Sequence, residues 1–246
     1  MEARRVRIGQ ATVVYRVVGA GDPVVLVHGL AGSTRWWGGN IGALATHHQV
    51  YLVDLVGFGE SRGRGRFALA EASTLLARWL DLLLQERVAL VGHSMGGLIA
   101  AELAADFPDR VSKLVLVNAA ALPLDRRQIR RPLNLAWTVR QTPPRYLPIL
   151  VGDAARAGPL TLWRARRDLL AADIRPKLAH IQAPTLVIWG AEDRLVPLSL
   201  GEQLQRAIPQ ATLAVIPHAG HIPMWERPDA FNALVGTFLA TKEGDG

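Results

Sequence analysis

Ser94 is the side chain of this sequence that is best placed to act as a nucleophile. It lies in the run Gly92-His93-Ser94-Met95-Gly96-Gly97, after the apolar residues 88–91 and before the helix-forming residues 98–105. A serine on a sharp turn from a strand to a helix has a strained backbone, and its hydroxyl is exposed above the sheet. The glycines on either side remove the Cβ atoms that would clash in so tight a turn. With a strand and a helix around it, the motif predicts nucleophilic catalysis.

A base and an acid for this serine are offered by two later loops. A serine hydroxyl is a poor nucleophile at neutral pH and needs a base that a third group orients. Asp193 follows the apolar run 185–190, and His221 follows the run 212–216. The order nucleophile, acid, base is the order in which this strand–turn–helix architecture places them. Glu192 and His218 are the competing candidates, and for His218 we expect a structural hydrogen-bonding role instead.

The oxyanion of an acyl-transfer intermediate also needs hydrogen-bond donors. One predicted donor is the backbone N–H of Met95, directly after the nucleophile and at the start of a helix. The second is expected from the loop His28-Gly29-Leu30-Ala31-Gly32-Ser33, where the N–H of Leu30 is the best candidate. His28 is expected to brace this loop by hydrogen bonding and not to transfer protons.

These groups require an α/β fold that gathers loops at one edge of a sheet. The predicted strands span residues 6–8, 12–18, 24–27, 50–54, 89–92, 114–118, 185–190 and 212–216. The predicted helices span residues 70–85, 95–106, 199–208 and 229–240. Alternation of strand and helix predicts a mostly parallel central sheet with helices on both faces. Functional loops then collect at the carboxyl ends of the strands.

The alternation breaks between residues 118 and 184, a stretch rich in Arg, Pro, Trp and Leu. We interpret it as a small helical cap, inserted at about residues 122–182 into a single domain that spans residues 1–246. Residues 122–183 contain 11 Arg and 1 Lys against 4 Asp, so the insert carries the excess behind the net charge of +7. Such a surface either is simply solvated or attracts anionic substrates. Because the excess is confined to the insert, we expect no nucleic-acid partner.

Composition narrows the class of protein further. The 246 residues are 50% hydrophobic and 20% charged, which suits one α/β domain with a large core. The absence of cysteine excludes disulfides, thiolate metal sites and a thiol nucleophile, and it fits a cytoplasmic location. We find no signal-peptide pattern and no apolar run long enough to be a transmembrane segment. No metal-ligand spacing, phosphate loop or dinucleotide fingerprint is present, so no metal and no cofactor are expected.

Four tryptophans lie where a substrate would be held. Trp36 and Trp37 follow the predicted oxyanion loop, and Trp137 and Trp163 lie in the insert. Such side chains either line an apolar acyl pocket or anchor the packing of the cap and the adjoining helix. Both interpretations remain open at this point.

Four blocks of the sequence resemble the α/β-hydrolase superfamily and, within it, the capped group of serine esterases and lipases. They are, in the order of the family, His28-Gly29, Asp54-Leu55-Val56-Gly57-Phe58-Gly59-Glu60-Ser61, the run 92–97 and Gly220-His221. The resemblance covers nearly the whole chain except the insert. It implies that Ser94, Asp193 and His221 form a catalytic triad. It also implies that the amides of Leu30 and Met95 form the oxyanion hole.

The function implied by this resemblance is cleavage of small-molecule carboxylic esters through an acyl-enzyme intermediate, with Asp54 in a structural role. Relatives that open carbon–halogen or epoxide bonds carry an aspartate at the position of Ser94, and the serine here excludes that mechanism. Three alternatives of the same fold are a lactonase, a carbon–carbon bond hydrolase and a cofactor-free perhydrolase. Trp225 is shared with carbon–carbon bond hydrolases, although plain core packing also explains it. A non-catalytic ligand receptor is the remote alternative, and no feature sets an oligomeric state.

Overall fold

The computed structural model describes residues 1–123 and 132–241, and its centre is an eight-stranded sheet. The strand order is β1-β2-β4-β3-β5-β6-β7-β8. The strands are β1 (Arg4–Ile8), β2 (Ala11–Val18), β3 (Asp22–Val27), β4 (His48–Asp54), β5 (Val88–His93), β6 (Val111–Val117), β7 (Thr185–Gly190) and β8 (Ala211–Ile216). All eight predicted strands are confirmed, with ends that differ by up to three residues.

The direction of the strands follows the sequence pattern. β1 and β2 form an antiparallel hairpin in which Ile8 pairs with Ala11, and β2 pairs antiparallel with β4. From β4 onward through β3, β5, β6, β7 and β8, each neighbouring pair is parallel. β3, β5 and β7 are nearly continuous apolar runs, as expected for strands that are covered on both faces. The carboxyl ends of the parallel strands therefore meet at one edge.

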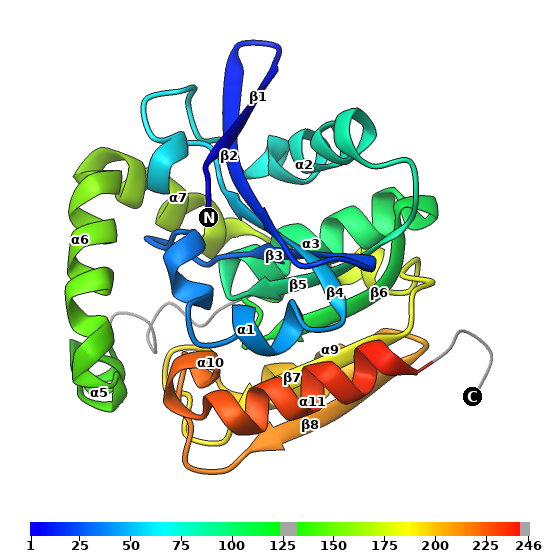
Figure 1. The fold of residues 1–246 in the computed structure, drawn as a ribbon. Helices are drawn as coiled ribbons and strands as arrows, with labels where there is room; N and C mark the ends of the chain where they lie inside the picture. The colour runs from blue at the N-terminus through cyan, green and yellow to red at the C-terminus, as the bar shows by residue number, and fades with distance from the viewer. Residues whose placement is uncertain (124–131, 242–246) are drawn as a thin grey trace.

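Helices cover both faces of the sheet (Figure 1). The helices are α1 (Ile41–Leu44), α2 (Leu69–Leu83), α3 (Met95–Asp106), α5 (Pro132–Gln141), α6 (Leu147–Ala157), α7 (Pro159–Ala171), α8 (Arg175–Leu178), α9 (Leu198–Ala207), α10 (Pro223–Glu226) and α11 (Pro228–Ala240). Short 3₁₀ turns span Thr34–Trp37, Gly59–Ser61, Pro108–Arg110 and Pro144–Tyr146. One buried cluster joins the sheet to α2, α3, α8 and α9, and a second joins it to α1, α10 and α11. The predicted α/β-hydrolase architecture is confirmed.

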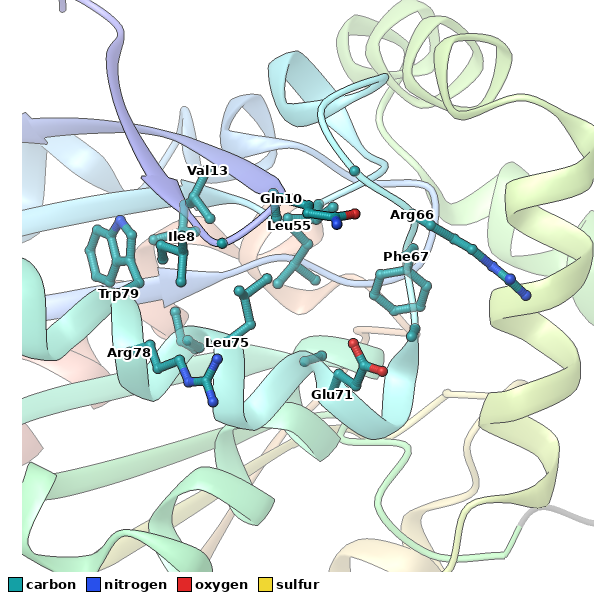
Figure 2. A pocket seen from close by; sticks show the side chains of 18 of the residues that line it. Ile8, Gln10, Val13, Leu55, Arg66, Phe67, Glu71, Leu75, Arg78 and Trp79 are labelled. Carbon is teal, nitrogen blue, oxygen red and sulfur yellow. The ribbon is translucent and has the colours of Figure 1, made fainter.

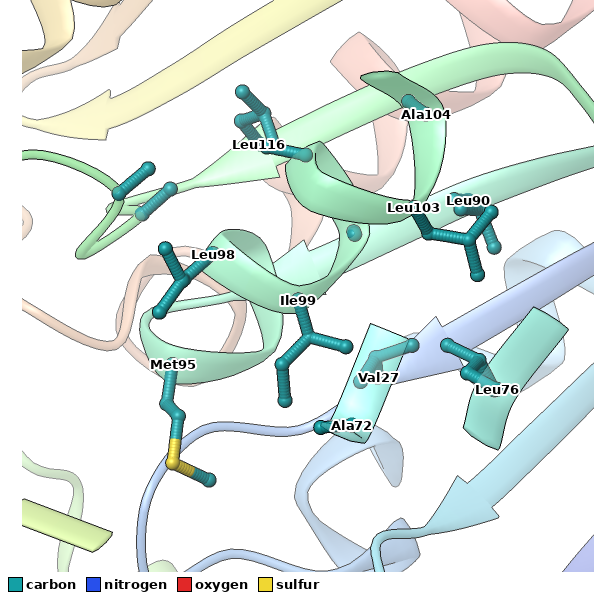
Figure 3. Packing of buried hydrophobic residues seen from close by; sticks show 14 of the residues in the cluster. Val27, Ala72, Leu76, Leu90, Met95, Leu98, Ile99, Leu103, Ala104 and Leu116 are labelled. Atoms are coloured by element: carbon teal, nitrogen blue, oxygen red, sulfur yellow. The ribbon is translucent and has the colours of Figure 1, made fainter. Parts of the chain in front are cut away.

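Helix α3, which begins directly after Ser94, is buried on nearly every side. Figure 3 shows Ile99 pointing toward Ala72 of α2, while Leu103 lies beside Leu90 of the sheet. A helix that is apolar all round belongs to the inside of a domain. Packing on both sides therefore fixes the start of α3, and with it the turn that carries Ser94.

Helices α5, α6 and α7 lie between β6 and β7 in the chain. α5 and α6 stand at the side of the layers (Figure 1), whereas Ala165 and Leu169 of α7 belong to the first buried cluster. The three helices occupy the place where the sequence predicts a cap. Residues 124–131 of that predicted insert lie outside the described residues. Asp153 of α6 hydrogen-bonds to Ser33 in the loop after β3, and Gln141 of α5 hydrogen-bonds to Glu192 in the loop after β7. Both contacts fall at the carboxyl edge of the sheet.

A cavity of about 410 Å³ lies between the β1–β2 hairpin and α2 (Figure 2). Its walls include Val13, Leu55, Phe67, Leu75 and Trp79. None of the predicted triad residues lines it, so it is separate from the candidate active site. Within the part of the chain that the structure describes, no helix has the length and apolar character needed to cross a membrane.

Candidate active site

Ser94 occupies a strained position between β5 and α3. Its backbone has φ 52° and ψ −115°, in a region that residues other than glycine rarely adopt. A Cβ atom at Gly92 would lie 2.4 Å from the carbonyl oxygen of Gly96, and one at Gly96 would lie 2.4 Å from the carbonyl oxygen of Val27. Both distances are far below van der Waals contact. The predicted need for glycine two residues before and after Ser94 is confirmed.

The structure brings Ser94, Asp193 and His221 together at the carboxyl edge of the sheet. Nε2 of His221 lies 3.1 Å from the Oγ of Ser94, and Nδ1 lies 2.8 Å from Oδ2 of Asp193. All three residues are buried, with 8 to 9% of their surface exposed. This is the relay that a nucleophile, a base and an orienting carboxylate require. Nδ1–H donates to the carboxylate, which leaves Nε2 free to accept the serine proton.

Electrostatics at His221 favour its charged form. Burial of the ring lowers its pKa, but the negative charge of Asp193 and its hydrogen bond outweigh that effect, and Glu226 adds to them. The pKa of His221 is therefore raised above its ordinary value. A base with a raised pKa holds a proton more firmly once it has taken one.

Asp193 is itself held by groups from two other positions. Its Oδ1 accepts hydrogen bonds from the amides of Leu195 at 2.8 Å and Val196 at 3.0 Å. The Nδ2 of Asn118 donates to Oδ2 at 2.5 Å and to the carbonyl oxygen of Gly220 at 3.2 Å. Asn118 thus ties the acid loop to the histidine loop. Sequence reasoning treated it only as the last strand residue, whereas its φ of 42° places it beyond the end of β6.

The two competing candidates point elsewhere. Oε2 of Glu192 accepts a hydrogen bond from Gln141 at 2.8 Å, and its Oε1 lies 3.5 Å from Nδ1 of His218. The side chain of His218 is 78% exposed. Among the described contacts, neither residue reaches Ser94. Their positions favour Asp193 and His221.

The loop after β3 approaches Ser94 closely enough to contribute an amide. A Cβ atom at Gly29 would lie 3.1 Å from the Cβ of Ser94 and 2.9 Å from Nδ1 of His93, so only glycine fits there without displacing a neighbour. Leu30 follows directly. On the other side of the nucleophile, Met95 is the first residue of α3, where a backbone N–H has no partner within the helix. The loop after β3 and the start of α3 are therefore two backbone segments that lie next to the nucleophile.

His28 braces this loop, as the sequence predicts. Its Nδ1 donates to the carbonyl oxygen of Gly29 at 2.8 Å, and its Nε2 accepts from the amide of Leu55 at 3.1 Å. Burial lowers the pKa of His28, which keeps the ring neutral and able to accept that second bond. The ring joins the loop after β3 to the loop after β4.

Asp54 has the structural role that was expected. Its carboxylate accepts hydrogen bonds from the amides of Thr34 at 2.7 Å and Glu60 at 2.9 Å, and Arg16 lies 3.9 Å away. These contacts secure the turn Gly59–Ser61 against the loop after β3.

His93, the neighbour of Ser94, contacts the backbone of His221. Its Nε2 lies 2.8 Å from the carbonyl oxygen of His221, to which it donates, and the two rings are 5.0 Å apart. Burial, followed by the nearby charge of His221, lowers the pKa of His93 far enough to keep it neutral. The sequence correctly placed this side chain away from the nucleophile, but it gave no sign of the contact with the base.

The tryptophans divide between packing and surface. Of the two interpretations left open for Trp37, substrate pocket or packing, the structure supports packing, because its side chain is fully buried and packs against Phe231 at a centroid distance of 6.4 Å. Trp36 is 3% exposed and lies 4.8 Å from Trp225 and 5.7 Å from His93. Trp225, itself fully buried, also stacks on Tyr146 at 4.5 Å. Core packing therefore accounts for Trp225.

The two tryptophans of the insert lie under arginines. Trp163 is 59% exposed, with the guanidinium of Arg167 5.4 Å from its ring. Trp137 is partly buried, and the guanidinium of Arg194, the residue after Asp193, lies 3.7 Å from the centre of its ring. A cation over an indole face is attractive. Trp137 therefore fastens α5 to the loop of Asp193, and Trp163 faces solvent on α7.

No group of three or more His, Asp or Glu side chains within residues 1–123 and 132–241 is arranged to hold a metal ion. The polar side chains of Ser94, His221 and Asp193 instead contact one another. The arrangement can move a proton from a hydroxyl to an imidazole and hold a developing negative oxygen with backbone amides. Those are the operations of acyl transfer through a serine.

Comparison with known proteins gives the class. A sequence profile of the alpha/beta hydrolase family matches residues 24–234. The chain belongs to this family and is a hydrolase of that fold.

Individual relatives cover nearly the full chain but differ in substrate. The chain is 34% identical over 250 residues to a protein described as a carbamate hydrolase, RutD, of Azorhizobium caulinodans, covering 92% of this chain and 94% of that protein. It is 32% identical over 257 residues to a pimeloyl-[acyl-carrier protein] methyl ester esterase of Pectobacterium carotovorum, with coverages of 93% and 98%. The crystal structure of an enol-lactonase from Burkholderia xenovorans superposes with a TM-score of 0.82 at 26% identity, with coverages of 97% and 100%.

Proposed function

We propose that this protein hydrolyses carboxylic esters through an acyl-enzyme intermediate, with Ser94, His221 and Asp193 as its catalytic triad. The observation that carries the proposal is the continuous relay from the Ser94 hydroxyl through His221 to Asp193, with contacts of 3.1 and 2.8 Å. The 32% sequence identity to a methyl ester esterase supports an ester as the bond that is cleaved. Ester hydrolysis also requires no group beyond those at the site.

In the acylation step, Oγ of Ser94 attacks the acyl carbonyl carbon while Nε2 of His221 takes its proton. The negative oxygen of the tetrahedral intermediate is held by the backbone N–H groups of Leu30 and Met95. Asp193 stabilises the imidazolium that has formed and keeps the ring in register. The intermediate then collapses: the ester bond breaks, and His221 returns its proton to the departing alcohol.

Deacylation repeats these events with water as the nucleophile. His221 takes a proton from the water molecule that attacks the acyl-Ser94 carbonyl, and the same two amides hold the oxyanion. The bond to Oγ then breaks, Ser94 recovers a proton from His221, and the carboxylic acid leaves. The net reaction consumes one water and gives one acid and one alcohol.

The decisive experiment uses a fluorophosphonate probe, which labels a serine only where a base activates it. The wild-type protein is expected to be labelled at one site, and Ser94→Ala to lose that label. His221→Ala should react far more slowly while keeping its fold. Failure of the wild type to react, or equal labelling of Ser94→Ala, would contradict the proposal and favour a receptor that kept the fold.

The type of bond is resolved by a panel of nitrophenyl esters of increasing acyl length, lactones and vinylogous diketones. The proposal expects the highest kcat/KM for an ester. The basic insert adds a second expectation, that esters of acidic acyl groups are preferred, since exposed arginines raise the local concentration of anions. Rates for acidic and neutral esters that are equal at low and at high salt would remove this second expectation alone.

A further inference from the structure

Glu226 is a buried carboxylate that the proposed mechanism leaves unused. It is the last residue of α10 and is 9% exposed, although glutamate is a residue that proteins rarely bury. One oxygen, Oε1, accepts the amide N–H of Ile222 at 3.1 Å, and the other, Oε2, accepts the amide N–H of Gly220. The carboxylate therefore binds the residue before His221 and the residue after it.

Two carbonyl oxygens of this backbone segment also accept hydrogen bonds from side chains. Asn118 donates to the carbonyl oxygen of Gly220, and His93 donates to the carbonyl oxygen of His221. Glu226 thus supplies the acceptors of the segment, while Asn118 and His93 supply the donors. A backbone held in this way leaves the imidazole little freedom to move relative to Ser94.

The charges near Glu226 come from several elements. His221 and Asp193 are close enough to influence it, the first favouring its charged form and the second opposing it. Glu192, His218 and Arg227 line the same surface hollow as Glu226, together with Gln141 of α5. Burial raises the pKa of Glu226, and the two amide hydrogen bonds, with His221, partly offset this. A carboxylate is kept in this position although burial opposes its charge.

We propose that Glu226 is a positioning residue for His221, which fixes the backbone on both sides of the base and places a second negative charge behind its ring. The inference rests on the proposed function, because it assigns His221 the role of base. Glu226 would thus support the triad as a fourth side chain, although it touches neither the substrate nor the reacting atoms.

The chemistry of the two contacts gives the test. The two N–H donors reach two separate oxygens of the carboxylate, whereas a glutamine side chain has one oxygen. In Glu226→Gln the amide group has one acceptor and must turn an N–H toward one of the backbone donors, while the negative charge is lost. We expect kcat to fall about 10- to 100-fold, as for other groups that orient a site residue, with KM unchanged. Because a negative charge near the imidazolium has been removed, the acid limb of the kcat/KM profile should move to lower pH.

Glu226→Asp separates position from charge. It keeps the carboxylate but shortens its arm by one methylene, so it should lower kcat while leaving the acid limb where the wild type has it. It also carries the test if the Gln variant does not fold. The matched control is Glu192→Gln, which removes a more exposed carboxylate next to Asp193. It should leave kcat within about twofold of the wild type and the acid limb at the same pH.

The outcomes are distinguishable from failure of the proposed function. Lack of fluorophosphonate labelling in the wild type would refute the serine mechanism itself. If the wild type reacts, and the folded Glu226→Gln variant keeps both the wild-type kcat and the wild-type acid limb, the positioning role is refuted. A loss of kcat in Glu226→Gln with an unmoved acid limb would refute the electrostatic half of the inference. So would a shift as large in Glu192→Gln.

Discussion

Replacing Asp153 by alanine removes a buried carboxylate that joins helix α6 to the loop carrying the proposed oxyanion donor. The side chain is 1% exposed. It accepts the hydroxyl of Ser33 at 2.7 Å, forms an ion pair with Arg35, and lies 3.7 Å from Arg156. Ser33 is also the N-cap of the turn Thr34–Trp37, accepting the amide of Arg35 at 3.2 Å. Loss of Asp153 therefore loosens the insert and this loop together.

The magnitude follows from the exposure of each partner. Ser33 is 3% exposed, so its hydroxyl loses a charge-assisted hydrogen bond that water replaces poorly, which costs about 1.5–3 kcal/mol. Arg35 and Arg156 are 43% and 54% exposed, so solvent screens their pairs and they add at most about 1 kcal/mol. The total of about 1.5–4 kcal/mol corresponds to a fall in Tm of about 3–16 °C for a chain of this size.

The effect on catalysis should be smaller than that of losing an oxyanion donor outright, which costs about 10²–10³ in kcat. Because Leu30 lies three residues before Ser33, we expect kcat to fall about 10-fold as its amide loses a fixed position. Differential scanning calorimetry and hydrolysis of a nitrophenyl ester measure the two effects. The matched control is Asp168→Ala on α7, whose carboxylate pairs with its exposed neighbour Arg167 and should change stability by less than about 0.5 kcal/mol. Equal losses of Tm in the two variants would refute this reasoning.

Three further outcomes are expected at the site. Asn118→Ala removes the donor shared by Asp193 and the Gly220 carbonyl and should lower kcat about 10- to 100-fold, measured with a nitrophenyl ester, without a comparable change in KM. Gly29→Ala places a Cβ 3.1 Å from that of Ser94 and should reduce the rate of fluorophosphonate labelling, whereas Gly42→Ala, with no atom within 4 Å, should not. Since the base must be neutral to act and its pKa is raised, kcat/KM of the wild type should rise with pH through a limb above the ordinary histidine value; a limb below that value would contradict the assigned electrostatics.

The sequence was most informative where short patterns dictate local geometry. Apolar runs such as Val24–Val27 predicted buried parallel strands, because a strand covered on both faces has no polar side. The glycines around Ser94 predicted the turn, because no other residue fits against the carbonyl oxygens of Gly96 and Val27. The order of acid and base along the chain followed from the order of the strands, because parallel strands end at the same edge.

The sequence was silent where the contact joins residues far apart in the chain. Asn118 and Asp193 are 75 positions apart, and Ser33 and Asp153 are 120 positions apart, and neither pair has a motif of its own. The place of Trp37 after the predicted oxyanion loop left a substrate pocket and packing equally open, and its burial against Phe231 of α11 supports packing. Local pattern cannot distinguish an aromatic side chain that points toward a site from one that points beneath it.

The same difference explains why the residues around the base were harder to find than the base. His221 is recognisable because a glycine and a following apolar turn accompany it in the chain. Its orientation, however, depends on Asn118 after β6, His93 at the end of β5 and Glu226 at the end of α10. Each of them bonds to the backbone of the histidine loop and not to the imidazole ring. Many side chains can bond to a backbone group, so such a contact leaves no recognisable motif in the sequence at these three positions. We nevertheless infer that all three help to set the distance between Nε2 of His221 and Ser94.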